Sequence, residues 1–162
     1  MNRSTKILCC IGAGMLFNGA TQNVQAGKVH ARGKYSVAQR EVLDAVDALF
    51  VAMGRHDVAA SRKLIIPGAG FMVINADGTS VMERDIDYLD SLAKHKEVFH
   101  ERIWKPQVTV QGNIAQVWAA YDFHLDDKFS HCGIDSFSMV RSADGWRIAS
   151  VSYTVQKQGC AP

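Results

Sequence analysis

The residue of this chain with the clearest chemical potential is Asp135, an acid set in a run of apolar residues. Ile134 precedes it and Phe137 follows two positions later. A carboxylate removed from water in such a setting has a raised pKa, so it could act as a general base or a general acid. It could equally contact a ligand, or it could be a structural acid whose hydrogen bonds Thr154 or Tyr121 satisfy. The sequence leaves these three roles open.

The histidines do not extend this site into a catalytic pair or a metal centre. His131 falls on the same strand face as Asp135, but four residues along a strand span about 13 Å, so the two side chains cannot touch. His124 and His131 flank one loop yet fall on opposite faces, and no group of residues has the spacing of a zinc or iron site. No phosphate-binding glycine loop and no Gly-x-Ser-x-Gly motif is present. The sequence therefore predicts no metal and no cofactor.

Three amphipathic helices are predicted ahead of the segment that carries Asp135. Ser36 followed by Gln39 is a capping-box pattern, and apolar residues from Val42 to Met53 recur at helical spacing. A second, short helix begins after Asp57, a favourable N-cap residue, and extends to about Leu64. A short hairpin (71–74 and 79–82) separates it from a third helix in the region of residues 83–93.

Four long strands are predicted after the helices, over residues 98–111, 114–125, 129–141 and 146–156. Gly112-Asn113 and Asp144-Gly145 fit two-residue hairpin turns, and Asp126-Asp127-Lys128 fits a three-residue loop. Pro106 interrupts the first strand and indicates a bulge or an edge segment. This order predicts an α+β fold in which a cone-shaped, strongly curved, mixed or antiparallel sheet wraps around three N-terminal helices. Such a cone has an open mouth and an apolar interior that suits a small molecule.

The turns fix which residues share a face of this sheet. They place Asp135 opposite Ala119 on one side and opposite Thr154 on the other. They place Trp104 opposite Tyr121, provided that Pro106 does not shift the pairing by one residue. The ligand pocket predicted inside the cone is formed by Phe71, Trp104, Tyr121, His131, Asp135 and Phe137.

The N-terminus has the anatomy of a secretory signal peptide. Arg3 and Lys6 form a short basic region, an apolar run covers residues 7–17, and Val24-Gln25-Ala26 is a small-x-small cleavage site. We expect residues 1–26 to be removed, residues 27–35 to be a flexible leader, and residues 36–162 to form one domain. The alternative is that the segment is retained as a membrane anchor.

Cleavage after Ala26 would leave a nearly neutral, exported protein. Only Arg3 and Lys6 are lost from 18 basic residues, so 16 basic and 16 acidic residues remain. A neutral chain without a basic stripe predicts no nucleic-acid partner and no stable membrane association. The predicted localisation is secreted or periplasmic.

The cysteines that remain after cleavage are Cys132 and Cys160. An even pair in an exported protein favours a disulfide, and the strand register places Cys132 opposite Lys157, only three residues before Cys160. A chain that turns back there can bring the two Cα atoms within about 4.4–6.8 Å, the range that a disulfide needs. The alternative is two separate thiols.

Three motifs carry a resemblance to a known family: Tyr121-Asp122-Phe123-His124, Phe129-Ser130-His131-Cys132-Gly133 and Asp144-Gly145-Trp146-Arg147-Ile148. Together with the order of the elements, they make residues 36–156 similar to the nuclear transport factor 2-like superfamily, also called SnoaL-like. The motifs and the ending Gly159-Cys160 resemble its exported bacterial branch named lumazine-binding.

The resemblance implies an α+β cone that commonly dimerises through its outer sheet face. Enzymes of the superfamily include ketosteroid isomerases, dehydratases and polyketide cyclases, which use acids and histidines inside the cone, while many other members only bind ligands or partners. Asp135 lies in a strand where isomerase-like members can carry an acid.

Three functional hypotheses follow. The first is an exported domain that binds a small apolar or aromatic molecule inside the cone. The second is a ketosteroid-isomerase-like or polyketide-cyclase-like enzyme with Asp135 as general base and without a metal. The third is an interaction module that forms a homodimer through the outer sheet face, which the register predicts to carry Trp118 and Tyr153.

Overall fold

The computed structural model describes residues 34–160, which form three helices and one six-stranded sheet. The helices are α1 (Val37–Gly54), α2 (Val58–Leu64) and α3 (Asp85–Leu92). The strands are β1 (Ile65–Asn75), β2 (Ser80–Arg84), β3 (Phe99–Gln111), β4 (Ile114–Leu125), β5 (Lys128–Ser142) and β6 (Gly145–Val155). The predicted signal peptide, residues 1–26, and most of the predicted leader lie outside the described residues. Within the described range, no helix has both the length and the apolar character needed to cross a membrane.

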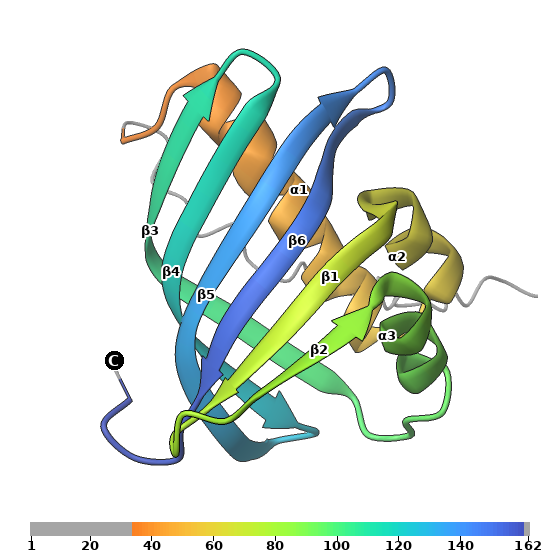
Figure 1. Ribbon diagram of the computed structural model, residues 1–162, viewed down its shortest axis with the longest axis vertical. Helices are drawn as coiled ribbons and strands as arrows, with labels where there is room; N and C mark the ends of the chain where they lie inside the picture. The colour runs from red at the N-terminus through yellow and green to blue at the C-terminus, as the bar shows by residue number, and fades with distance from the viewer. Residues whose placement is uncertain (1–33, 161–162) are drawn as a thin grey trace, which may run out of the picture.

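The sheet is mixed, with the strand order β2-β1-β6-β5-β4-β3. Its only parallel neighbours within residues 34–160 are β1 and β6, and all other neighbours are antiparallel. Figure 1 shows the strands bending strongly along their length, with α1 running across one face of the sheet and α2 and α3 beside β1 and β2. The predicted α+β cone is therefore confirmed.

Helix α1 fills one end of this cone. The capping box at its start is present, because Ser36 accepts a hydrogen bond from the Gln39 amide and Gln39 accepts one from the Ser36 amide. The amide of the Gln39 side chain also donates to the carbonyl of Val108 on β3, which ties the helix start to the sheet. The buried residues of its first three turns pack in one cluster with residues of the long strands, which include Val117, Met139 and Ile148.

A bulge at Lys105 and Pro106 divides β3 into two halves, and the alternation of inward-facing and outward-facing side chains is reversed between them. Trp104 pairs with Ala120 and Gln107 pairs with Trp118, so Lys105 and Pro106 together lie opposite one residue of β4. An extra residue in a strand reverses which side chains face the core from that point on. The predicted pairing of Trp104 with Tyr121 is therefore wrong, and Ile103 occupies that position.

The two other hairpins also differ in detail from the prediction. Between β4 and β5 the turn is Asp126-Asp127 rather than a three-residue loop, but a bulge at Ser130 restores the predicted partners, so Ala119 lies opposite Asp135 as expected. Between β5 and β6, Ser142 pairs with Gly145, and a later bulge leaves Asp135 opposite Tyr153 instead of Thr154.

Strand β1 begins earlier than predicted. The first strand of the short hairpin was expected at residues 71–74, whereas β1 already begins at Ile65 and includes Pro67 and Gly68. They fall in the irregular stretch between Ile65 and Gly70, where the pairing with β6 is interrupted, so the missing N–H of Pro67 removes no ladder hydrogen bond.

Candidate functional site

A cavity of about 360 Å³ lies between the helix-covered face of the sheet and the helices. Its helical wall comes from the last turns of α1 and from α3, and residues of all six strands contribute to the rest. Most of the lining is apolar or aromatic, and the volume is near the lower end of the range for small-molecule sites. A second depression, beside α3, is lined by Asp87, Asp90, Ser91, Lys94 and His95; it is more open to solvent and contains no buried residue. We therefore place the candidate site in the cavity inside the cone.

Five of the six residues predicted for the pocket line this cavity: Phe71, Tyr121, His131, Asp135 and Phe137. The sixth, Trp104, does not, because the bulge at Pro106 turns its side chain to the outer face. There its ring lies 5.5 Å from the guanidinium of Arg102. Whether the five lining residues contact a ligand stays a prediction.

The bulge brings a second acid into the cone beside Asp135. With the orientation of the first half of β3 reversed, Glu101 faces inward and lines the cavity. Asp135 on β5 lines it too and is only 2 % exposed. The two carboxyl groups interact directly, since each changes the pKa of the other. Asp135 is therefore one member of a carboxyl pair rather than an isolated acid.

Burial dominates the electrostatics of this pair. Loss of hydration raises the pKa of Asp135 to about 7, although a hydrogen bond from Glu101 acts in the opposite direction. The pKa of Glu101 lies well above its usual value, first because of burial and then because of the negative charge of Asp135. Glu101 thus holds its proton more strongly than an exposed glutamate and donates it in a hydrogen bond to Asp135, whose own pKa lies near neutrality.

Three tyrosines surround the carboxyl pair, and burial raises the pKa of each. Tyr121 was expected to donate a hydrogen bond to Asp135 or to a ligand, but its hydroxyl donates to the carbonyl of Thr154 at 2.8 Å. Tyr88 stacks on Phe71 with a centroid distance of 4.5 Å, and its buried hydroxyl has no hydrogen-bond partner among the described residues. Tyr153, predicted on the outer face, lines the cavity because of the shifted β5–β6 pairing.

The histidines take no part in the carboxyl pair. His131 lies against the rings of Tyr121 and Phe123, at centroid distances of 5.8 and 4.9 Å. Burial, and secondarily the charge of Lys157, lower its pKa, so His131 is neutral at neutral pH. His124 is 3.7 Å from Asp122. Within residues 34–160, no group of three His, Cys, Asp or Glu side chains is placed to hold a metal ion.

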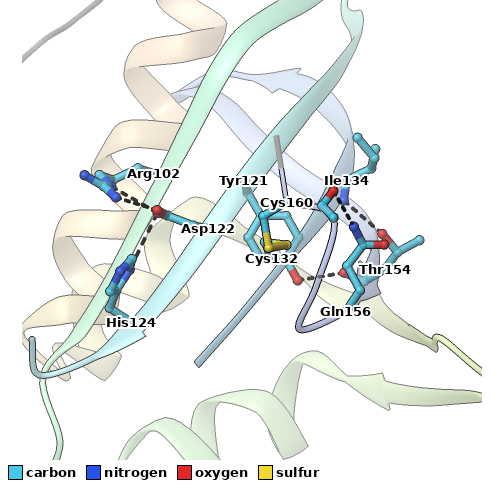
Figure 2. The surroundings of a disulfide bond; sticks show 10 residues. Arg102, Tyr121, Asp122, His124, Cys132, Ile134, Thr154, Gln156 and Cys160 are labelled. Carbon is cyan, nitrogen blue, oxygen red and sulfur yellow. Dashed lines mark hydrogen bonds and ion pairs between the residues drawn. A yellow bond between two sulfur atoms is a disulfide. The ribbon is translucent and has the colours of Figure 1, made fainter. Parts of the chain in front are cut away.

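The predicted disulfide between Cys132 and Cys160 is present, with a Cα–Cα distance of 5.7 Å. Cys132 pairs with Gln156 through two backbone hydrogen bonds of 2.9 Å, one residue away from the predicted partner Lys157. Figure 2 shows the disulfide beside the cluster in which Arg102 binds the carboxylate of Asp122, the residue that pairs with Cys132 across the sheet. The bond fixes the C-terminal segment over the end of β5.

The outer sheet face carries the predicted Trp118, whose side chain is 53 % exposed. Its neighbour on β5 is Ser136, which in turn pairs with Ser152 on β6. Because Tyr153 lies inside the cone, the outer face is more polar than expected. A homodimer through this face stays a prediction.

Comparison with known proteins places the fold. No protein-family model matches the chain, and no curated protein matches it. Solved structures do match, among them a protein of unknown function from Shewanella baltica, with 14 % identity and a TM-score of 0.58 over 76 % of this chain and 99 % of that one. Another, from Novosphingobium aromaticivorans, has 13 % identity and a TM-score of 0.60 over 76 % of this chain and 84 % of that one, and is described as having a cystatin-like fold. A third, from Salmonella enterica, has 19 % identity and a TM-score of 0.58 over 75 % and 94 %.

All three are described as nuclear transport factor 2-like proteins. This chain has the nuclear transport factor 2-like (NTF2-like) fold. At these identities the likeness concerns the fold alone, and the lumazine-binding branch is not among these relatives. The chemistry of this NTF2-like cone must therefore be argued from its own residues.

The lining residues of the NTF2-like cone that sequence reasoning missed include Glu101, Tyr88 and Tyr153. The sequence did contain a signal for Glu101, because Pro106 indicated a bulge. A bulge exchanges the inward-facing and outward-facing side chains of the residues that precede it. Whether Tyr153 faces the cavity depends on the last hairpin, whose turn could be placed at more than one position. Whether Tyr88 faces it depends on how the third helix packs, which the strand register does not determine.

Proposed function

We propose that this chain is an exported small-molecule-binding domain whose NTF2-like cone holds a small apolar or aromatic ligand. The observation that carries the proposal is the cavity of about 360 Å³, in which a mostly apolar or aromatic wall surrounds one buried carboxyl pair. Such a combination of apolar walls with a few convergent polar groups is typical of ligand sites. The disulfide supports export, because such bonds persist in oxidising compartments.

The proposal is tested with N-phenyl-1-naphthylamine, a neutral aromatic probe that has one N–H donor and fluoresces strongly in apolar surroundings. We expect one probe molecule to bind per chain. Val151→Phe, which adds bulk to a residue of the cavity lining, should weaken binding at least about tenfold, because the added ring occupies the site. Asp135→Ala should weaken binding about three- to tenfold through loss of the acceptor for the N–H, while the fold stays intact.

The matched controls are Ser152→Phe and Asp127→Ala. Ser152 is adjacent to Val151 on β6 and is not part of the cavity lining, and Asp127 is exposed in the β4–β5 turn. Neither change should affect the fluorescence titration. Equal affinity of the wild type and Val151→Phe would contradict the proposal, with far-UV circular dichroism used to confirm that each variant is folded.

A second candidate function is acid–base catalysis of the ketosteroid-isomerase or polyketide-cyclase kind. The pKa of Asp135, raised to about 7 by burial, favours it, because a group that titrates near the working pH can both take up and release a proton. In this alternative Asp135 is the general base and Glu101 is the group that keeps it in place by a hydrogen bond.

A further inference from the structure

The cavity has an uneven distribution of ionisable groups. The acids in its lining are Glu83, Glu101 and Asp135, and the lining contains no lysine or arginine. Its two histidines do not offset the acids: His131 is neutral at neutral pH, and His95 is an exposed residue that pairs with Glu97 at 3.5 Å. The nearby guanidinium of Arg102 binds Asp122, which does not line the cavity. The interior of the cone is therefore acidic.

Asp135 has an unsatisfied oxygen in this acidic interior. Its Oδ2 atom is buried and finds no partner among the N–H groups and hydroxyls of residues 34–160. A buried carboxylate oxygen without a donor is unfavourable, and a donor with a positive charge compensates it better than a neutral one. The free position at Oδ2 thus points to a ligand group that donates a hydrogen bond and is positively charged.

The walls around the pair suit a cation as well. The faces of aromatic rings attract cations, and the lining includes Phe71, Tyr88, Tyr121, Phe123 and Tyr153. The hydroxyl of Tyr88 has no partner among the described residues and can accept a hydrogen bond as well as donate one. The acidic lining, the unpaired Oδ2 atom of Asp135 and the aromatic rings thus all favour a positively charged ligand.

We infer that the cone binds a small organic cation, an aromatic or aliphatic primary amine whose ammonium group contacts Asp135 and Glu101. This inference rests on the proposed function and narrows it to one class of ligand. The ring or chain of the amine lies against the aromatic wall, and its ammonium group donates to the free Oδ2 atom of Asp135.

The pH dependence of binding follows from the groups that face Asp135. The ionisable side chains that line the cavity with it are Glu83 on β2, Glu101 on β3, Tyr121 on β4, His131 on β5, Tyr153 on β6, Tyr88 on α3 and His95 beyond α3. Burial raises the pKa of the tyrosines and of Glu101 and lowers that of His131, whereas the pKa of Asp135, about 7, lies between pH 6 and 8, so Asp135 titrates in this range. A cation favours its ionised form, so binding releases a proton and the affinity rises with pH.

The test compares three molecules of similar size by isothermal titration calorimetry: tryptamine, tryptophol and indole-3-acetate. They share an indole ring and differ in carrying an ammonium, a hydroxyl or a carboxylate group. At pH 8 we expect tryptamine to bind at least about tenfold more tightly than tryptophol, and indole-3-acetate to bind most weakly. From pH 6 to 8 the affinity for tryptamine should rise roughly tenfold, with proton release measured from buffers of different ionisation enthalpy, while that for tryptophol stays nearly constant.

Asp135→Asn should abolish both the preference for tryptamine over tryptophol and its pH dependence, while far-UV circular dichroism confirms that the variant is folded. Asp127→Asn, in the exposed turn, is the matched control. If tryptophol binds as tightly as tryptamine, or if indole-3-acetate binds best, the inference is wrong while the proposed binding function stands. If none of the three binds while N-phenyl-1-naphthylamine does, only the inference is contradicted; if that probe also fails to bind, the proposed function is contradicted as well.

Discussion

At the scale of single residues, the chemistry of this protein depends on two carboxyl groups placed together in a dry site. Neither Glu101 nor Asp135 is paired with a basic side chain, and both have raised pKa values because ionisation there is opposed by lost hydration. A buried acid that keeps its proton is destabilising only once it ionises. The carboxyl pair therefore destabilises the fold at high pH, and its presence indicates a role other than stability.

The cost of ionising buried Asp135 predicts that the unfolding free energy depends on pH. The pKa of Asp135 is about 7 when folded and near 3.8 when unfolded, so the folded state holds a proton that the unfolded chain releases between these values. Relative to Asp135→Asn, the wild type should lose on the order of 2–4 kcal/mol of unfolding free energy as the pH rises from about 4 to about 7. Urea unfolding at pH 4 and pH 8 measures this difference.

The same measurement separates the functional candidates. If the difference between wild type and Asp135→Asn does not change with pH, Asp135 has an ordinary pKa. That result would remove acid–base catalysis by Asp135, and it would also remove the pH dependence expected for amine binding.

At the scale of elements, the site is positioned by places where the strands depart from regular pairing. The bulge at Lys105 and Pro106 turns Glu101 inward, and Lys105 adopts a positive φ of 46° to make it. At Gly133, by contrast, the position must be occupied by a residue without a side chain. A Cβ atom there would lie 1.9 Å from the carbonyl oxygen of Thr154, the same oxygen that accepts the hydrogen bond from Tyr121.

Gly133→Ala should therefore disrupt the contact between β5 and β6. Because the clashing atom belongs to the backbone, the neighbours cannot relax easily, and we expect a loss of about 3 kcal/mol or more in unfolding free energy. Gly70→Ala is the control, since its Cβ would meet only the flexible Met82 side chain at 3.1 Å and should cost less than about 1 kcal/mol. Equal urea midpoints for the two variants would contradict this explanation.

At the scale of the whole molecule, α1 packs into one end of the cone and leaves the other end hollow. The disulfide lies beside the hollow end, because Cys132 directly follows the cavity-lining residue His131 on β5 and is only 1 % exposed. The bond closes a loop across a sequence separation of 28 residues, which includes β5 from Cys132 onward and all of β6. Cross-linking such a loop restricts the unfolded chain more than the folded one.

Removal of the disulfide should accordingly weaken the fold as a unit. Cys132→Ala combined with Cys160→Ala should lower the unfolding free energy by roughly 3–4 kcal/mol, the value expected for a loop of this length. Adding a thiol reductant to the wild type should have the same effect, and the reductant should leave the double variant unchanged. Unfolding of the wild type that is insensitive to the reductant would show that the bond does not contribute.

The sequence by itself determined the order of the elements, the four long strands and the burial of Asp135, and it favoured the pairing of Cys132 with Cys160. These features depend on local signals: hydrophobic periodicity, capping residues and turn residues act over a few positions and keep their meaning in any fold. The partners of β4 and β5 near Asp135 were predicted correctly because the bulge at Ser130 compensates for a turn that is one residue shorter than predicted.

Only the tertiary structure decided that Glu101, Tyr88 and Tyr153 line the cavity and that Trp104 does not. One extra residue in a strand exchanges its two faces, and the position of that residue depends on distant contacts, such as the hydrogen bond of 2.7 Å from the Tyr35 hydroxyl to the Pro106 carbonyl. A proline indicates that a bulge is present, but it does not say where the regular pairing resumes. That single shift turns Glu101, the second acid of the site, into the cone.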